Sequence, residues 1–192
     1  MTQQQKNLSG LKVAILVANG FEQVEMVEPR KALDQAGAQT HLVSPARDKV
    51  RGWIFNKGKL GEWGDEFSVD VSLDRAQERD YDALMLPGGV MSPDSLRMEP
   101  KAVEFAKAFF TSGKPVAVIC HGPWTIIETG VLRGRTITSW GSIKTDLRNA
   151  GAEWVDREVV SERNLISSRM PNDIPAFNRE MISLFARLRP QH

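Results

Sequence analysis

The chain has 192 residues, 41% of them hydrophobic, and its 25 Lys and Arg nearly balance its 24 Asp and Glu. A chain of this length forms one ordinary domain and buries enough surface to fold without a disulfide or a metal. The balanced charge supplies no long-range field for nucleic acid or an anionic membrane, so neither is expected as a partner.

Residues 1–10 are polar and carry no apolar signal core. We predict that they form a flexible N-terminal tail, followed by a single domain over residues 11–190. The longest early apolar run, residues 13–18, is far too short to span a bilayer. The single cysteine excludes an internal disulfide, and with no signal segment this favours a cytoplasmic location.

Buried strands and amphipathic helices alternate along the chain. Continuous apolar runs that end at turn residues indicate strands, and apolar residues at helical spacing that stop near glycine indicate helices. Strands are predicted over residues 12–18, 40–44, 81–86, 115–119, 136–138 and 165–168. Helices are predicted over residues 24–36, 101–110, 123–129, 144–150 and 174–188. Residues 52–71 combine several glycines with alternating polarity, which predicts a small hairpin excursion on the sheet.

This alternation predicts an α/β fold with a mostly parallel sheet and helices on both faces. In such sheets ligands bind at the carboxyl ends of the strands. Three loops are expected there, at residues 20–25, 87–94 and 120–123.

Cys120 directly follows the predicted strand 115–119 and precedes a segment, His121-Gly122-Pro123, that begins a helix. A residue at this turn points over the edge of the sheet, near a helix N-terminus that favours thiolate over thiol. We therefore expect a reactive nucleophile with a lowered thiol pKa. The alternative is a small buried apolar residue, the usual fate of a lone cysteine.

His121 is the only histidine expected near Cys120, because His192 ends the chain and His41 lies in a predicted strand. It is a candidate either for the base that accepts the thiol proton or for a cation that stabilises the thiolate. The alternative is a turn histidine that bonds its own backbone.

Glu22, Glu25 and Glu28 gather where the first strand turns into a helix. Acids in a first helical turn are often only partners of the helix dipole, which is our interpretation for Glu28. A carboxyl close to Cys120 tends to be protonated and can then donate a hydrogen bond to a thiolate. Glu25 is the first candidate for this role.

Gly88 and Gly89 follow the predicted strand 81–86. They either form a tight turn or offer a bare backbone amide to an oxyanion. Asp94 lies just beyond and, taken alone, is interpreted as a helix cap. Five tryptophans, among them Trp53 and Trp140, are expected mainly in core packing, with the rim of a pocket as the alternative.

Six segments in order resemble the PfpI family, within the class I glutamine amidotransferase-like superfamily. They are FEQVE at 21–25, DALMLPGG at 82–89, KPVAVICHGP at 114–123, GVLRGR at 130–135, NAGAEWVD at 149–156 and ISSRMP at 166–171. The resemblance runs from residue 13 to about residue 188 and implies a flavodoxin-like three-layer sandwich. It implies Cys120 as the nucleophile with His121 beside it, and a hydrogen bond from Glu25 to the cysteine with Glu22 close by.

The resemblance further implies an oxyanion site formed by the backbone amides of Gly89 and His121. In PfpI-like oligomers an acid after Pro-Gly-Gly reaches the histidine from a neighbouring subunit. Here that position is Asp94, one methylene shorter than the Glu of the peptidase pattern. A homo-oligomer, a dimer or higher, is therefore expected. No late His-x-Glu exists, so glutaminase activity is not expected, and no cofactor or metal motif is present.

The resemblance implies a stress-related cysteine-dependent hydrolase that acts on peptide or glycated (methylglyoxal-adduct) carbonyl substrates through Cys120. The alternative is a protein without turnover, either an oxidative-stress sensor or a protective chaperone, whose Cys120 is oxidised to a sulfinate.

Overall fold

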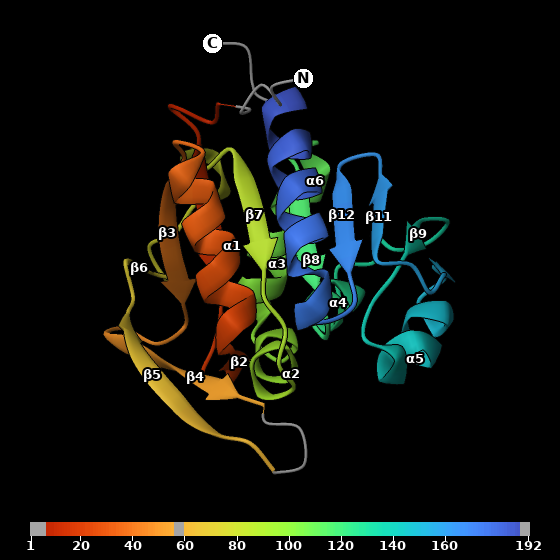
Figure 1. The fold of residues 1–192 in the computed structure, drawn as a ribbon, viewed down its shortest axis with the longest axis horizontal. Coiled ribbons are helices and arrows are strands. Elements are labelled where there is room, and N and C mark those ends of the chain that lie inside the picture. Colours follow the sequence, from red (N-terminus) through yellow and green to blue (C-terminus); the bar gives the residue numbers. More distant parts are fainter. Residues whose placement is uncertain (1–6, 56–59, 189–192) are drawn as a thin grey trace.

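A seven-stranded sheet runs through the middle of the molecule, with helices on both faces (Figure 1). The computed structural model describes residues 7–55 and 60–188. The strands of this sheet are β1 (Lys12–Leu16), β3 (Gln39–Ser44), β6 (Val71–Ser72), β7 (Ala83–Leu86), β8 (Val116–Ile119), β11 (Val159–Glu162) and β12 (Leu165–Ser168). Their order is β11-β12-β8-β7-β1-β3-β6, and every neighbouring pair is parallel except β11 with β12.

Two apolar layers enclose this sheet, because successive residues of a strand face opposite sides. In β8, Ala117 and Ile119 join one core cluster while Val116 and Val118 join the other. The first cluster is covered by α1 (Gln23–Gln35) and α6 (Ile174–Arg187), in front of the sheet in Figure 1. The second is covered by α3 (Pro100–Thr111), α4 (Pro123–Ile127) and α5 (Lys144–Asn149). The predicted three-layer α/β architecture is therefore confirmed.

The hairpin predicted over residues 52–71 exists, but it does not lie on the main sheet. The strands β4 (Lys49–Ile54) and β5 (Glu62–Ser68) form a separate three-stranded sheet with β2 (Phe21–Glu22), and part of the predicted range, residues 56–59, lies outside the described residues. Most β5 side chains are exposed, so this strand carries too little apolar surface to be covered by helices on both faces. The chain returns to the main sheet only at β6.

Three further differences concern short elements. The strand predicted over 136–138 appears as β9 (Thr136–Ile137), which pairs with β10 (Glu153–Trp154) in a two-stranded sheet of its own. The strand β11, which closes one edge of the main sheet, was not predicted, and α2 (Met91–Arg97) begins before Asp94, the residue interpreted as the cap of a helix there. The described elements also include short 3-10 helices at Glu78–Asp80, Gly141–Ile143 and Pro171–Asp173.

Part of the predicted N-terminal tail, residues 1–10, belongs to the folded domain. Residues 1–6 lie outside the described residues, but Leu8 is fully buried in the core and its amide donates to the carbonyl of Ala36 at 2.8 Å. Leu8 therefore belongs to the folded domain, because its apolar side chain covers the end of α1. Among residues 7–55 and 60–188, no helix is long and apolar enough to cross a membrane.

The strand order places one crevice in the sheet. The chain builds outward from β1 through β3 in one direction, and through β7 and β8 in the other. Ligands bind at such a reversal, outside the carboxyl ends of the strands. The loops after β1, β7 and β8 meet there, and they are the three loops predicted from the sequence.

Candidate active site

Cys120 sits at a strained turn directly after β8. Its φ is 60°, and among the described residues only Arg163 shares a positive φ with it outside glycine. The strain is maintained because both backbone groups of Cys120 are bonded: its amide donates to Ser168 O and its carbonyl accepts from Trp140 N, each at 3.0 Å. Holding a non-glycine residue in this region costs about 1–3 kcal/mol, which makes Cys120, at the edge of the sheet, a candidate functional position.

Gly88 gives Cys120 and Glu25 room to approach each other. A Cβ on Gly88 would lie 2.6 Å from Cys120 Cβ and 2.5 Å from Glu25 Oε2. The Gly88 amide donates to the same Oε2 at 3.0 Å. Glycine at this position therefore brings a carboxyl from α1 against the thiol at the end of β8.

We predict that Gly88→Ala disrupts the site and lowers the melting temperature, because the added methyl has no space. Overpacking of this kind costs about 1–3 kcal/mol. Gly141→Ala is the matched control, since a Cβ there meets nothing within 4 Å. Equal melting temperatures for the two variants, measured by calorimetry, would contradict the prediction.

His121 contacts Cys120 through one ring nitrogen and a serine through the other. Its Nδ1 lies 3.3 Å from Cys120 Sγ, and its Nε2 lies 3.3 Å from Ser142 Oγ. The ring is packed edge-on against Trp124 and stacked on Trp140. Burial lowers the pKa of His121 to about 4. The imidazole is thus neutral near pH 7 in the resting site, which favours the predicted base over the predicted cation.

Glu25 is fully buried, and burial followed by the nearby charge of Glu22 raises its pKa to about 8. Its Oε2 accepts from Gly88, while its Oε1 has no hydrogen-bond partner in the described part of the chain. Cys120 is the other polar neighbour of this carboxyl. The expectation that Glu25 is protonated near pH 7, and so able to donate to the sulfur, agrees with this geometry.

The expected lowering of the Cys120 pKa is wrong for this structure. Only 7% of Cys120 is exposed, and burial, with a further contribution from Glu25, raises the pKa of its thiol. The prediction relied on a helix N-terminus, on His121 and on an acid that donates a hydrogen bond, but α4 has only five residues, His121 is neutral and Glu25 raises the pKa of the thiol. The amides of Gly89 and His121 act in the opposite direction, because both donate toward the sulfur and favour the thiolate. The resting side chain is therefore a thiol surrounded by groups ready to accept its proton or stabilise its charge.

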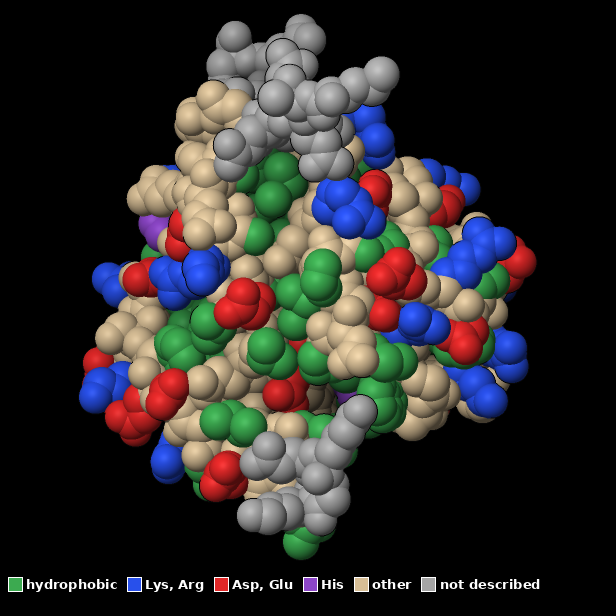
Figure 2. Space-filling view, viewed as in Figure 1, with side chains coloured by type: hydrophobic (Ala, Val, Ile, Leu, Met, Phe, Trp, Pro, Cys, Tyr) green, Lys and Arg blue, Asp and Glu red, His purple; other side chains and the backbone are tan. Residues whose placement is uncertain are grey.

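A cavity of about 520 Å³ opens over these groups. It is lined by Glu22, Glu25, Trp53, Phe55, Gly89, Val90, Met91, Cys120, His121, Trp140, Ser142 and Pro171. The polar side chains cluster around the sulfur and the walls are mostly apolar. Figure 2 shows the face of the molecule seen in Figure 1, where hydrophobic side chains are interspersed with charged ones. Two of the tryptophans assigned mainly to core packing thus form part of a pocket, while Trp63 packs against Trp53 from outside it.

Glu22 and Asp94 differ in how the fold places them. Glu22 is buried in the cavity wall, its Oε1 lies 3.5 Å from the Phe55 amide, and burial raises its pKa. Asp94 is exposed in the first turn of α2, and within the described chain it does not line the cavity that holds His121. It does not cap α2 either, because the residue at the N-cap position is Val90. A role for Asp94 therefore requires a second subunit and stays a prediction.

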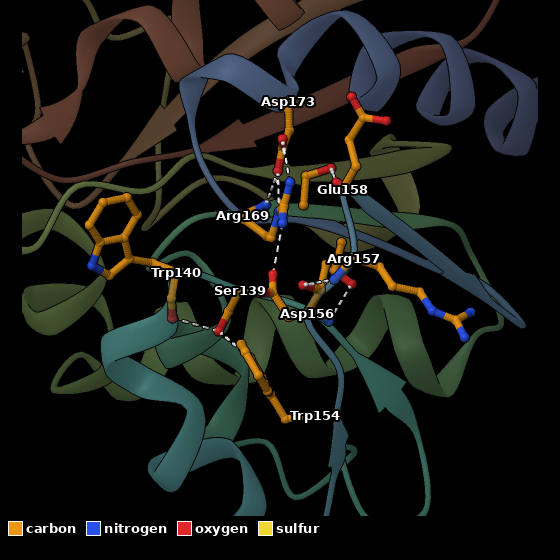
Figure 3. A network of polar contacts seen from close by, with 11 residues as sticks. Ser139, Trp140, Trp154, Asp156, Arg157, Glu158, Arg169 and Asp173 are labelled. Atoms are coloured by element: carbon orange, nitrogen blue, oxygen red, sulfur yellow. Dashed lines mark hydrogen bonds and ion pairs between the residues drawn. The ribbon is translucent and has the colours of Figure 1, made fainter.

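Sequence reasoning missed two features of the site. Ser142 was not considered, because the turn that carries it reaches the site only through tertiary contacts. Arg169 was seen only as part of a motif, yet it anchors the wall after β12 (Figure 3). Its guanidinium bonds both carboxylate oxygens of Asp173, at 2.9 and 3.1 Å, and Oδ1 of Asp156 at 2.7 Å. This network fixes the start of α6 next to Pro171, which lines the cavity.

These observations define a class: a parallel α/β domain with a cysteine in a left-handed turn at the sheet edge, beside a buried histidine and a buried acid. Residues 11–184 match the model of the DJ-1/PfpI family, and the chain belongs to that family.

Relatives agree with this assignment. The chain is 43% identical over 175 residues to "Deglycase PfpI" of Pyrococcus furiosus, covering 91% of this chain and 99% of the relative. It is 44% identical over 179 residues to "General stress protein 18" of Bacillus subtilis, covering 93% and 99%. Among solved structures, a two-domain protein of Anabaena variabilis with DJ-1/ThiJ/PfpI-like and ferritin-like domains matches with a TM-score of 0.81 and 35% identity. That match covers 90% of this chain and 47% of the other. The flavodoxin-like fold implied by the sequence is confirmed.

Proposed function

We propose that this protein is a stress-related, cysteine-dependent hydrolase that acts on glycated carbonyl adducts through Cys120. The observation that carries the proposal is the pairing, in one cavity, of a thiol held at φ 60° with a neutral histidine nitrogen 3.3 Å away. A relative named as a deglycase supports the substrate class. A cavity of about 520 Å³ has the size of a small-molecule site, which suits an adduct of this kind.

In the proposed reaction, Cys120 Sγ bonds to the carbon that carries the amine and hydroxyl groups of a methylglyoxal adduct, and its proton passes through His121 Nδ1 to the departing amine as the C–N bond breaks. The hydrogen left on that carbon then moves to the neighbouring ketone carbon through an enediolate, so an α-hydroxy thioester forms without an external oxidant. Negative charge develops on the oxygen of the enediolate, where the amides of Gly89 and His121 are the candidate donors and protonated Glu25 adds no charge. Water hydrolyses the thioester, which releases an α-hydroxy acid and the Cys120 thiol.

The sensor alternative is less well supported by this geometry. Oxidation to a sulfinate proceeds from an accessible thiolate. Cys120 is 93% covered, and burial raises the pKa of its thiol. Such a thiol reacts best with a substrate that enters the cavity and engages the base.

The test is turnover of two substrate sets by the wild type and by Cys120→Ala. One set holds methylglyoxal adducts of N-acetylarginine amide, and the other holds short unmodified peptides. We expect cleavage of the adducts by the wild type alone. No turnover of either set, combined with rapid conversion of Cys120 to a sulfinate by peroxide in mass spectra, would favour the sensor instead. Preferential cleavage of the peptides would make the protein a peptidase.

Asp94 provides a separate prediction, which rests on the proposed homo-oligomer. If Asp94 of a neighbouring subunit orients His121, Asp94→Asn should lower turnover by less than the roughly 10⁴-fold seen when a serine-protease triad loses its acid. The melting temperature and the oligomer size by light scattering should be unchanged. Glu104→Gln, at an exposed position on α3, is the control. Unchanged turnover of Asp94→Asn would make Asp94 a surface residue.

A further inference from the structure

Ser142 meets the ring nitrogen of His121 that faces away from the thiol. Its Oγ lies 3.3 Å from Nε2, while Nδ1 on the other side of the ring lies 3.3 Å from Cys120 Sγ. The ring is also packed against Trp124 and Trp140, so its orientation is fixed. Ser142 lines the same cavity as Cys120.

The segment that carries Ser142 is tied directly to the nucleophile. The amide of Trp140 donates to the carbonyl of Cys120 at 3.0 Å, and Ile143 closes the following turn by donating to Trp140 O at 3.3 Å. Ser139 Oγ donates to Trp140 O and accepts from Trp154 Nε1, both at 2.9 Å (Figure 3). Any shift of this segment therefore moves Ser142 and the Cys120 backbone together.

We propose that Ser142 is the positioning residue that holds His121 in the tautomer able to take the Cys120 proton. A neutral imidazole has one N–H and one lone pair. Nδ1 can accept the thiol proton only if its lone pair faces Sγ, and the N–H then sits on Nε2, where Ser142 Oγ accepts it. Without that acceptor the N–H on Nε2 loses its hydrogen-bond partner, which favours the tautomer with the proton on Nδ1.

This role differs from that of a carboxylate. An acid would both orient the ring and stabilise the imidazolium that forms, whereas a hydroxyl mainly sets the tautomer. The single N–H on Nε2 points at one acceptor, so Ser142 and Asp94 of a neighbouring subunit are alternatives for orienting the resting ring. On this inference Ser142→Ala impairs His121 more than Asp94→Asn does. It rests on the proposed cysteine chemistry.

The test compares Ser142→Ala and Ser142→Thr, with Ser161→Ala on the exposed edge strand β11 as the control. Three readouts are taken on the full chain: turnover of a methylglyoxal adduct, the alkylation rate of Cys120 by iodoacetamide, and the ¹⁵N shifts of the His121 ring. A general base contributes about 10²–10⁴-fold, so we expect Ser142→Ala to lower kcat about 10-fold or more with KM unchanged. Alkylation should slow, and the ¹⁵N shifts should move toward the Nδ1–H tautomer. Ser142→Thr, which keeps the hydroxyl, should restore all three.

Two outcomes would overturn the inference: ring shifts and alkylation rate of Ser142→Ala that match the wild type, or equal losses in Ser142→Thr, which would indicate a packing role. Alkylation and ring shifts need no substrate. If they change as expected while the wild type turns over no adduct, the role of Ser142 is upheld and the proposed hydrolase fails.

Discussion

Replacing Cys120 by alanine is expected to reduce turnover by about 10⁴-fold or more while the fold is retained, since loss of a nucleophile removes nearly all covalent catalysis. No other cysteine exists in the chain. Ser142 also contacts His121, but its hydroxyl faces Nε2 and not Nδ1. It therefore cannot pass its proton to the nitrogen that serves Cys120. The initial rate of adduct hydrolysis at saturating substrate measures the effect.

The stability of the same variant separates chemistry from folding. Alanine fits the space of the thiol and keeps the positive φ, so its melting temperature should stay near that of the wild type. Cys120→Gly should raise stability, because glycine adopts φ 60° without strain. Arg163→Gly is the matched control, at φ 54° on an exposed turn remote from the cavity. Residual turnover above about 1% of wild type in Cys120→Ala would remove the cysteine from the proposed mechanism.

The features of the site that the sequence could predict are those formed by residues close together along the chain. An apolar strand that runs into Cys-His-Gly-Pro defines the nucleophile turn, because strand, turn and helix start are all encoded within a few residues. The place of Ser142 in the site could not be predicted from the sequence. A hydrogen bond from the Trp140 amide to the Cys120 carbonyl brings its segment there. No local pattern encodes that contact.

The prediction that the pKa of Cys120 is lowered was wrong for a related reason. Position at a helix start is a local feature and argued for a thiolate, but burial is a property of the assembled fold. At 7% exposure the cost of removing a charge from water outweighs a dipole from a five-residue helix. The protonated state of Glu25 was anticipated correctly because a carboxyl near Cys120 was expected to avoid a second anion, and burial acts in the same direction.

Glu25→Gln is expected to make the protein more stable than the wild type at alkaline pH. The pKa of Glu25 rises from 4.5 to about 8 on folding, mainly through burial. Between these two values the folded state retains a proton that the unfolded state has released. The stability contributed by the protonated carboxyl is therefore complete below pH 4.5 and is lost as pH rises toward 8.

The window from pH 6.5 to 8 avoids most of the contributions of His121 and Cys120. Burial lowers the pKa of His121 to about 4, so its contribution is lost only as pH falls below about 6.5. The raised pKa of Cys120 acts with the same sign as Glu25, but only above about pH 8.5, where the unfolded thiol ionises. Within the window the wild type should lose on the order of 1–2 kcal/mol, because the slope falls as Glu25 becomes half ionised near pH 8.

Glutamine is neutral at every pH, and its carbonyl oxygen can still accept from the Gly88 amide. The free energy of unfolding of Glu25→Gln, measured with urea at pH 6.5, 7.25 and 8, should therefore fall about 1–2 kcal/mol less than that of the wild type. Glu28→Gln, at an exposed position on the same helix, is the matched control and should follow the wild-type curve. Parallel curves for all three proteins would mean that Glu25 is already ionised at pH 6.5. In that case a protonated Glu25 could not assist Cys120, and the hydrolase mechanism would lose its uncharged donor.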